Sequence, residues 1–272
     1  MNAPLPVLTS RPLARGALGR LGVAAAMAAA LLAGAAAPAF ADDAAFSDGQ
    51  KDAIGGIVKD YLMAHPEVVR EALQELQRRD QEAEEAAKRA NLAKYEDQLF
   101  NSGKQVVLGN PNGDVTLVEF FDYNCGYCKR SHADMKRLLE EDKNLKIVLK
   151  EFPVLGQGSE EAAQVAVIVH EMAPEKYGAF HDELLMTRCE VMGASALAVA
   201  ADVGLDPEAV KARLKEPIIG ETISESFGLA QALGINGTPT YVLKGDVVVG
   251  AVGYDTLKDK IKSVRECGKA TC

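Results

Sequence analysis

The feature that most constrains the fold of this chain is a pair of cysteines placed where a buried strand runs into a helix. The apolar run Val115–Phe121 predicts a strand inside a sheet, and Cys125-Gly126-Tyr127-Cys128 then opens a helix expected to end near Glu141. A spacing of three along a helix places the two sulfurs within disulfide range. Cys125 would lie at the helix N-terminus, where free N–H groups and the helix dipole favour the thiolate. The pattern predicts thiol–disulfide exchange, with Cys125 as the attacking thiol and Cys128 as the resolving thiol.

Two other roles for this pair are possible in principle. Cys267 and Cys272 could complete a zinc site, but they lie five apart at the terminus, and zinc knuckles form on turns rather than at a strand-to-helix junction. A purely structural disulfide would close a very short loop and stabilise little. Redox chemistry is therefore favoured. We expect no metal and no cofactor other than the redox-active disulfide between Cys125 and Cys128.

The region from residue 103 to residue 272 has the pattern of one α/β domain. A long helical insertion, at about 154–235, separates three expected strands from two later ones. The later two are joined by Gly245-Asp246, which suits a hairpin turn. A final helix is expected at about Asp255–Cys267. Besides Val115–Phe121, the expected strands are Gln105–Leu108, Leu145–Phe152, Thr240–Lys244 and Val247–Gly250.

Residues 42–102 differ in character from this domain. Asp48 to Ala64 reads as an amphipathic helix, and Pro66 is well placed to begin a second helix that runs past Asn91. The segment either folds back on its own catalytic domain or associates with other copies of the chain, and we favour self-association. The apolar positions of the first helix are Ile54, Ile57, Val58, Tyr61 and Leu62, and those of the second are Val69, Leu73, Leu76, Ala83, Ala87 and Ala90.

The first 41 residues read as a secretory signal peptide. Three arginines precede an apolar run from Leu21 to Ala37, and Ala39-Phe40-Ala41 supplies the small residues of a cleavage site after Ala41. The run is only about 17 residues long and mostly Ala and Gly, which is short for a membrane anchor. Removing this segment leaves 27 basic against 39 acidic residues, a formal charge of −12. We expect an exported, periplasmic protein with no nucleic-acid partner.

At this point the chain resembles a known family. The run from Glu119 to Cys128 is similar to the active-site segment of DsbA-type thiol–disulfide oxidoreductases, and Gly237-Thr238-Pro239-Thr240 is similar to their cis-proline loop. The resemblance covers about 104–265. Residues 42–102 resemble the helical extension of the ScsC branch, which is related to Com1-like proteins. This implies an α/β thioredoxin fold with a helical insertion, preceded by an N-terminal helical segment that mediates oligomerisation.

The resemblance also implies roles for individual residues. Thr238 and Pro239 would lie beside the cysteines and bind an extended substrate, and Glu119 would be the buried acid that relays a proton at Cys128. Lys150 on the next strand is a candidate partner for Glu119, and the alternative is an ordinary surface Glu–Lys pair.

The dipeptide between the cysteines affects both how substrates are contacted and the reduction potential of the disulfide. Gly126 and Tyr127 would also contact substrate. Because neither is a histidine that could stabilise the thiolate, the strength of the oxidising potential stays open.

The favoured function is an exported enzyme that exchanges disulfides in cysteine-containing proteins, as an isomerase or reductase within an oligomer. A membrane redox partner is expected, and a homotrimer rather than a dimer is implied by the ScsC resemblance alone. The alternatives are a monomeric disulfide oxidase, a protein that binds Cu(I) through the same soft thiolates, and a binding module with a vestigial cysteine pair. The pairing of Cys189, Cys267 and Cys272 is left open, and His132 is expected to face solvent.

Overall fold

The computed structural model describes residues 46–272, so the predicted signal peptide, residues 1–41, lies outside the described residues. The chain divides into two compact units, one ending at His65 and one running from Pro66 to Cys272. Within the described part, no helix has the length and apolar character needed to cross a membrane.

Helix α1, Asp48–Ala64, is the described helix of the first unit and has the predicted bounds. It begins with a capping box, because the Gln50 N–H donates to Ser47 Oγ and the Ser47 N–H donates to Gln50 Oε1. None of its residues is buried. The apolar side chains that the sequence places on one face are therefore open to solvent in the single chain.

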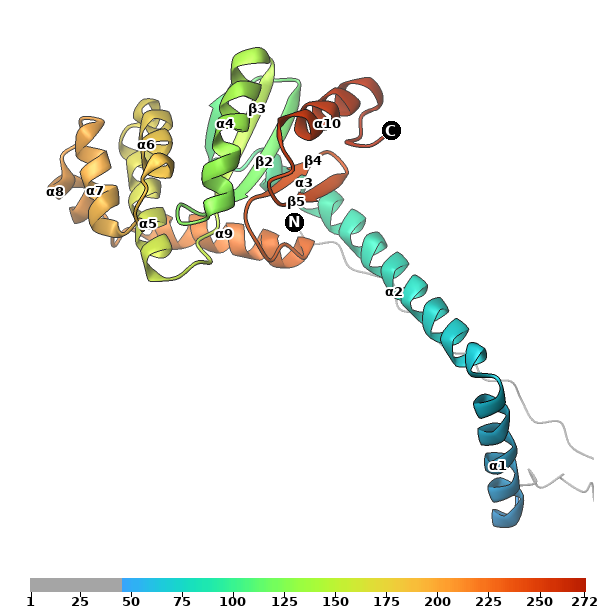
Figure 1. Cartoon of the computed structure of the whole chain (residues 1–272). Helices are drawn as coiled ribbons and strands as arrows, with labels where there is room; N and C mark the ends of the chain where they lie inside the picture. The colour runs from blue at the N-terminus through green and yellow to red at the C-terminus, as the bar shows by residue number, and fades with distance from the viewer. Residues whose placement is uncertain (1–45) are drawn as a thin grey trace, which may run out of the picture. The chain divides into compact units, whose positions relative to one another are not determined.

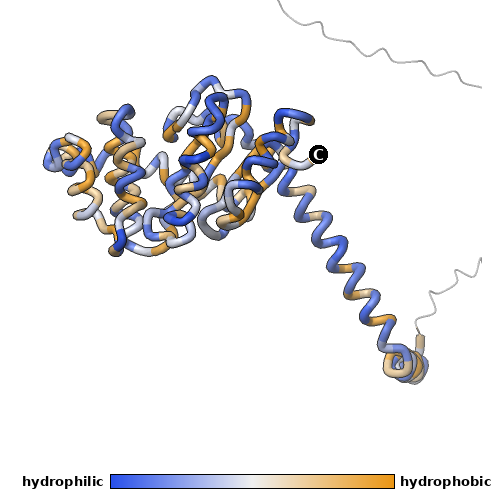
Figure 2. The backbone as a smooth tube through the Cα atoms, turned by 45° about the horizontal axis from the view of Figure 1, so that its top comes forward, coloured by the Kyte–Doolittle hydropathy of each residue, from blue (hydrophilic) through white to orange (hydrophobic). Residues whose placement is uncertain are grey.

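Helix α2, Pro66–Lys94, opens the second unit. Polar residues dominate along its length, interrupted by isolated apolar ones (Figure 2). Its last turns contact the domain, where Leu92 is buried and Asn91 Nδ2 donates to the Ala232 carbonyl at 2.6 Å. The apolar positions from Val69 to Leu76 remain exposed.

A five-stranded mixed sheet forms the centre of the second unit, with strand order β1-β3-β2-β4-β5. Strands β2 and β3 are parallel, and every other neighbouring pair is antiparallel. The central strand β2 is an almost unbroken apolar run because helices cover both of its faces. The strands are β1 Val106–Gly109, β2 Val115–Phe121, β3 Leu145–Glu151, β4 Thr240–Leu243 and β5 Asp246–Val249.

Helices cover the sheet on both sides (Figure 1). Helices α4, Gly126–Glu141, and α10, Tyr254–Cys267, pack on one face, together with much of the insertion. The short helix α3, Glu96–Phe100, packs on the other face with the end of α2 and with α9. The predicted helical insertion between β3 and β4 consists of α5 Gln157–Met172, α6 Pro174–Met186, α7 Gly193–Asp202, α8 Pro207–Ala212 and α9 Pro217–Leu233.

The register of β2 and β3 places Lys150 and Glu119 on opposite faces of the sheet. Glu119 lies opposite Leu149, whereas Lys150 lies opposite Phe120. Because side chains alternate along a strand, a shift of one residue reverses the face. The expected Glu119–Lys150 partnership is therefore wrong. Lys150 is fully buried, and its Nζ lies 3.1 Å from Glu225 Oε1 on α9 and donates to the Gln98 carbonyl of α3 at 2.7 Å.

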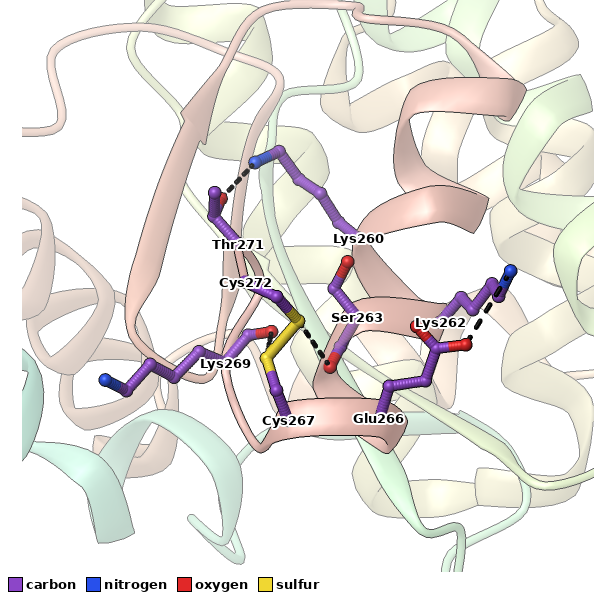
Figure 3. Close-up of a disulfide and its surroundings, with 8 residues drawn as sticks. All are labelled: Lys260, Lys262, Ser263, Glu266, Cys267, Lys269, Thr271 and Cys272. Atoms are coloured by element: carbon purple, nitrogen blue, oxygen red, sulfur yellow. Dashed lines mark hydrogen bonds and ion pairs between the residues drawn. A yellow bond between two sulfur atoms is a disulfide. The ribbon is translucent and has the colours of Figure 1, made fainter.

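A disulfide between Cys267 and Cys272 closes the C-terminus (Figure 3). Helix α10 ends at Cys267 and is capped by Gly268, whose φ of 76° is the left-handed conformation that favours glycine. The chain then turns back, and the buried Ala270 donates its N–H to the Lys244 carbonyl at 3.0 Å. The Cys267–Cys272 disulfide gives the pairing that the sequence left open, and it leaves neither of these two sulfurs free to bind zinc. Cys189 keeps a free thiol.

Replacing the buried lysine should measure how strongly α3 and α9 are attached to the sheet. Lys150→Met keeps the volume but leaves the Glu225 carboxylate without its cation, so we expect the free energy of unfolding in urea to fall by about 3 kcal/mol. Lys146→Met is the matched control, because Lys146 lies on the same face of β3, is half-buried and also donates to an α3 carbonyl, that of Phe100. Equal losses for both variants would contradict the ion pair's role.

Candidate active site

The structure places Cys125 at the junction that the sequence predicts, as the N-terminal cap of α4. Four residues after the end of β2, the Cys125 N–H donates to the Asp122 carbonyl at 3.0 Å, and the chain turns into the helix. The Cys128 backbone N–H donates to Cys125 Sγ at 3.4 Å. Both thiols are free and buried, with Cys125 5% exposed and Cys128 1% exposed.

These surroundings separate the acidities of the two thiols. Hydrogen bonds lower the pKa of Cys125 to about 5, and the largest contribution comes from the Cys128 thiol. The Thr238 side chain and backbone N–H groups at the start of the helix lower it further. Burial opposes this shift in part. Burial raises the pKa of Cys128 well above its usual range, and its hydrogen bond to Cys125 adds to the effect. Cys125 is therefore the thiolate and Cys128 the protonated partner at neutral pH.

The loop before β4 lies beside the cysteines. Because β4 runs antiparallel to β2 and Thr240 lies opposite Phe120, the residues preceding Thr240 reach the end of β2 from which the active-site turn departs. The Thr238–Pro239 peptide bond is cis, the isomer implied by the resemblance. The Cys125 thiol lies 3.2 Å from the Thr238 carbonyl, to which it donates when protonated.

Glu119 lies on the α4 face of β2 and is 5% exposed, so the alternative of a surface Glu–Lys pair is wrong. Burial raises the pKa of its carboxyl to about 8, the negative charge of Cys125 adds to the shift, and the Tyr241 hydroxyl partly offsets it. A carboxyl with this pKa exchanges protons near neutral pH. Its electrostatic influence extends to Cys128, whose pKa it helps to raise.

The dipeptide between the cysteines is open to solvent. Gly126 is exposed, and apart from its chain neighbours and the backbone of its own helix no atom lies within 4 Å of the position that a Cβ would occupy there. Tyr127 is 59% exposed, and the Arg130 guanidinium lies 4.2 Å from the centre of its ring. Both are accessible to an approaching protein.

Two positioning residues escaped the sequence reasoning, Asp122 and Asn124. The Asp122 carboxylate accepts four hydrogen bonds, which come from the N–H groups of Asn124, Val154 and Leu155 and from the Ser159 hydroxyl, at 2.7–3.0 Å. Short polar side chains at such a turn are themselves a signal, because Asp and Asn often bond to nearby backbone.

Asn124 attaches the active-site turn to the loop between α6 and α7. Its side-chain amide exchanges two hydrogen bonds with the backbone of Val191, at 2.7 and 2.9 Å. Lys129 Nζ donates to the Thr187 carbonyl in the same loop at 2.6 Å. This loop carries the exposed Cys189.

The prediction that His132 faces solvent is wrong. It is 7% exposed, because α6 of the insertion packs over this part of α4. Among residues 46–272, no three His, Cys, Asp or Glu side chains gather closely enough to hold a metal ion.

The family model of the DSBA-like thioredoxin domain matches residues 116–262, from β2 into α10. This chain belongs to the DsbA-like thioredoxin family. A second model, the copper resistance protein ScsC N-terminal domain, matches residues 50–83 in α1 and α2. The α/β thioredoxin fold with a helical insertion and an N-terminal ScsC-type segment is thus confirmed, and the chain is a thiol–disulfide oxidoreductase of the DsbA/ScsC type.

Individual relatives agree with this assignment. A thioredoxin-like oxidoreductase from Silicibacter pomeroyi is 41% identical, with a TM-score of 0.61, over 63% of this chain and 98% of that one. A linker-deletion variant of ScsC from Proteus mirabilis is 27% identical, with a TM-score of 0.63, over 82% and 99%. Disulfide bond formation protein D of Bacillus subtilis is 26% identical over 58% of this chain and 76% of its own length.

Alkylation should distinguish the two active-site thiols. In a Cys189→Ser background, we expect iodoacetamide to modify Cys125 at least about 100-fold faster than Cys128 at pH 6, because only the thiolate reacts. The Cys125 rate should fall as the pH is lowered through about 5, where its thiolate is protonated. Mass spectrometry of the modified peptides provides the measurement. Equal rates at the two sites would contradict the assignment.

Removing the Asn124 amide should loosen the loop from Thr187 to Met192. Asn124→Ala deletes both hydrogen bonds to the Val191 backbone, and we expect about 1–3 kcal/mol lower stability. Amide hydrogen exchange at Val191 should accelerate at least tenfold. Asn110→Ala is the control, since the Asn110 side chain also bonds to backbone groups but in an exposed turn before the opposite end of β2. Unchanged exchange at Val191 would show that other contacts hold the loop.

Proposed function

We propose that this protein is an exported enzyme that rearranges or reduces disulfides in cysteine-containing proteins, and that it works as a homotrimer. The exchange chemistry rests on the paired thiols of opposite acidity. The observation that carries the choice of an oligomeric isomerase over a monomeric oxidase is the exposed apolar face of α1.

The reaction follows from the two acidities. The Cys125 thiolate attacks one sulfur of a substrate disulfide, which forms a mixed disulfide and releases the other substrate sulfur as a thiolate. In isomerisation, a substrate thiolate then attacks the mixed disulfide and frees Cys125. In reduction, Cys128 attacks Cys125 instead, so that the substrate leaves as a dithiol and the enzyme is oxidised. Cys128 must lose its proton for this second step, and we propose that the Glu119 carboxylate accepts it.

Exposed side chains around the cysteines suit unfolded or misfolded proteins. Tyr127 is 59% exposed, and Val154 and Leu155, whose N–H groups donate to Asp122, are 39% and 52% exposed. Such apolar surface beside a reactive thiolate would bind apolar segments of substrates. Thr238 and Pro239 would align the substrate backbone next to Cys125.

The proposal of self-association rests on α1. Four side chains of its apolar face, Ile54, Ile57, Val58 and Tyr61, are 44–69% exposed. A continuous apolar strip of this kind on a soluble protein marks an interaction site. The match of residues 50–83 to the ScsC N-terminal domain supports this role. The choice of three copies rather than two rests on the ScsC resemblance.

Location and redox partner complete the proposal. The predicted signal peptide, with cleavage after Ala41, would deliver the chain to the periplasm, where a membrane redox partner would keep its cysteines in the working state. Reduction by such a partner would favour isomerisation, because only the dithiol form can attack scrambled substrates. The absence of histidine at Gly126 and Tyr127 is consistent with a weaker oxidant.

Copper binding is a second candidate function. The two free thiols are neighbours and soft, which favours Cu(I), and the N-terminal model is named for a copper resistance protein. A Cu(I) competition assay on the reduced protein, run beside insulin reduction, separates this function from exchange.

Charged substitutions on α1 test the oligomer and the isomerase together. In the chain from residue 42 onward, Ile57→Asp with Val58→Asp should reduce the mass in light scattering from three chains towards one, because the charges oppose burial of the strip. Refolding of a scrambled-disulfide substrate should fall at least fivefold, while insulin reduction persists. Met63→Asp is the matched control, since Met63 is 76% exposed on the opposite side of the helix. A mass of one chain for the unaltered protein would contradict the proposed oligomer and, with it, the preference for an isomerase over an oxidase.

A further inference from the structure

A small cavity lies beneath the active site, between the sheet and helices α4 and α6. Its volume is about 30 Å³, enough for one or two water molecules. Its polar lining consists of Glu119 from β2, His132 and Lys136 from α4, and His181 and Asp182 from α6, and apolar side chains form the rest. A buried carboxyl of the active site thus shares a cavity with groups of a helix in the insertion.

Glu119 needs an outlet for its proton if it serves Cys128 in every cycle. Once it has taken the Cys128 proton it is neutral, and it can act again only after that proton reaches solvent. The titratable groups that influence it from the packed elements are Cys125 and Cys128 of α4 and Tyr241 of β4. Cys128 and Tyr241 are at most 1% exposed, and Cys125 is bonded to the substrate in the mixed disulfide, so none of the three carries the proton to bulk water.

His132 and Asp182 make this connection on the other side of the cavity. His132 Nε2 lies 3.0 Å from Asp182 Oδ1, and the side chains are 7% and 37% exposed, so the pair extends from the interior to the surface. Asp182 Oδ2 accepts from Lys136 Nζ at 2.6 Å, and that lysine is 49% exposed. Burial lowers the pKa of His132, so its imidazole is neutral at pH 7 and has a free site for a proton.

His181 forms a fixed wall of the cavity rather than part of the outlet. Its Nδ1 lies 3.2 Å from the Tyr123 hydroxyl, which contacts the Tyr177 hydroxyl, and Tyr177 donates to Glu151. Burial lowers the pKa of His181 to about 3, so it stays neutral throughout the working range.

We propose that His132 and Asp182 are positioning residues that form the proton outlet of Glu119, with water in the cavity between them. The inference rests on the proposed role of Glu119. When Cys128 attacks the mixed disulfide, its proton moves to the Glu119 carboxylate and from there through cavity water to the free nitrogen of the His132 imidazole. The ring then releases its Nε2 proton to Asp182, from which it passes to bulk solvent. No electrons move along this route, and each group returns to its starting state.

Rates of the two steps of oxidation by glutathione disulfide distinguish a proton outlet at His132 and Asp182 from a structural role of these residues. Rapid mixing with the reduced protein resolves the attack by Cys125, which releases the first glutathione, from the attack by Cys128, which releases the second. His132→Gln should slow the second step at least fivefold at pH 6–7 and leave the first step unchanged. The difference should vanish above about pH 9, because Glu119 is then ionised before the step begins.

Three further variants complete the test. Asp182→Asn, at a half-exposed position, should reproduce the effect and keeps the test valid should His132→Gln fail to fold. His170→Gln is the matched control, since His170 is a half-buried histidine outside the cavity lining and should change neither step. In a Glu119→Gln background, His132→Gln should cause no further slowing, because it acts through Glu119.

The opposing outcomes are equally distinct. Three results for His132→Gln would overturn the proton outlet and assign His132 a structural role. They are slowing by the same factor at every pH, slowing of the first step, and slowing that adds to the effect of Glu119→Gln. A Glu119→Gln variant with a normal second step would remove the relay and the outlet together. Failure of the unaltered protein at the first step would count against the exchange reaction itself.

Discussion

The active site depends on a single buried carboxylate, that of Asp122. Its four hydrogen bonds join the turn after β2, the segment after β3 and the beginning of α5. The turn after β2 lies about thirty residues before the other two pieces, and the carboxylate joins it to both of them. Once they are fixed, Cys125 can begin α4 only in the position where the helix start and the cis-proline loop both reach its sulfur. The low pKa of Cys125 thus depends on how the chain is held at Asp122 and Asn124, three residues and one residue earlier.

Two other buried carboxyls show how different surroundings assign different roles. Glu151, at the end of β3, accepts a hydrogen bond from Tyr177 at 2.9 Å and lies 3.5 Å from the Tyr123 hydroxyl. Burial raises the pKa of both acids. Glu151 belongs to a closed network of aromatic hydroxyls, which fixes α6 against the turn that precedes the cysteines. Glu119 instead borders a cavity and a pair of thiols, where a proton can arrive and leave.

Much of this architecture could be predicted from the sequence, because local patterns determine it. The apolar run of β2, the position of Cys125 at a helix start and the proline at the start of α2 are each set by a few neighbouring residues. The predictions were wrong for side chains whose surroundings are set by an element distant in the sequence. Lys150 has its partner on α9, and His132 is buried by α6, so neither environment is visible in the surrounding residues. Helix α3 has only five residues, too few to display a helical period.

The terminal disulfide bears on how the chain acquires its own covalent structure. The five cysteines of the chain allow several different pairings, of which the structure contains one, and the other three cysteines keep free thiols. Cys267 and Cys272 are only five residues apart, whereas a bond from either of them to Cys125, Cys128 or Cys189 would close a much longer loop. Because short loops close with the smallest entropic cost, each of these two cysteines bonds more readily to the other than to Cys125, Cys128 or Cys189. Joined to each other, Cys267 and Cys272 have no thiol with which to form a mixed disulfide with Cys125 of the same chain.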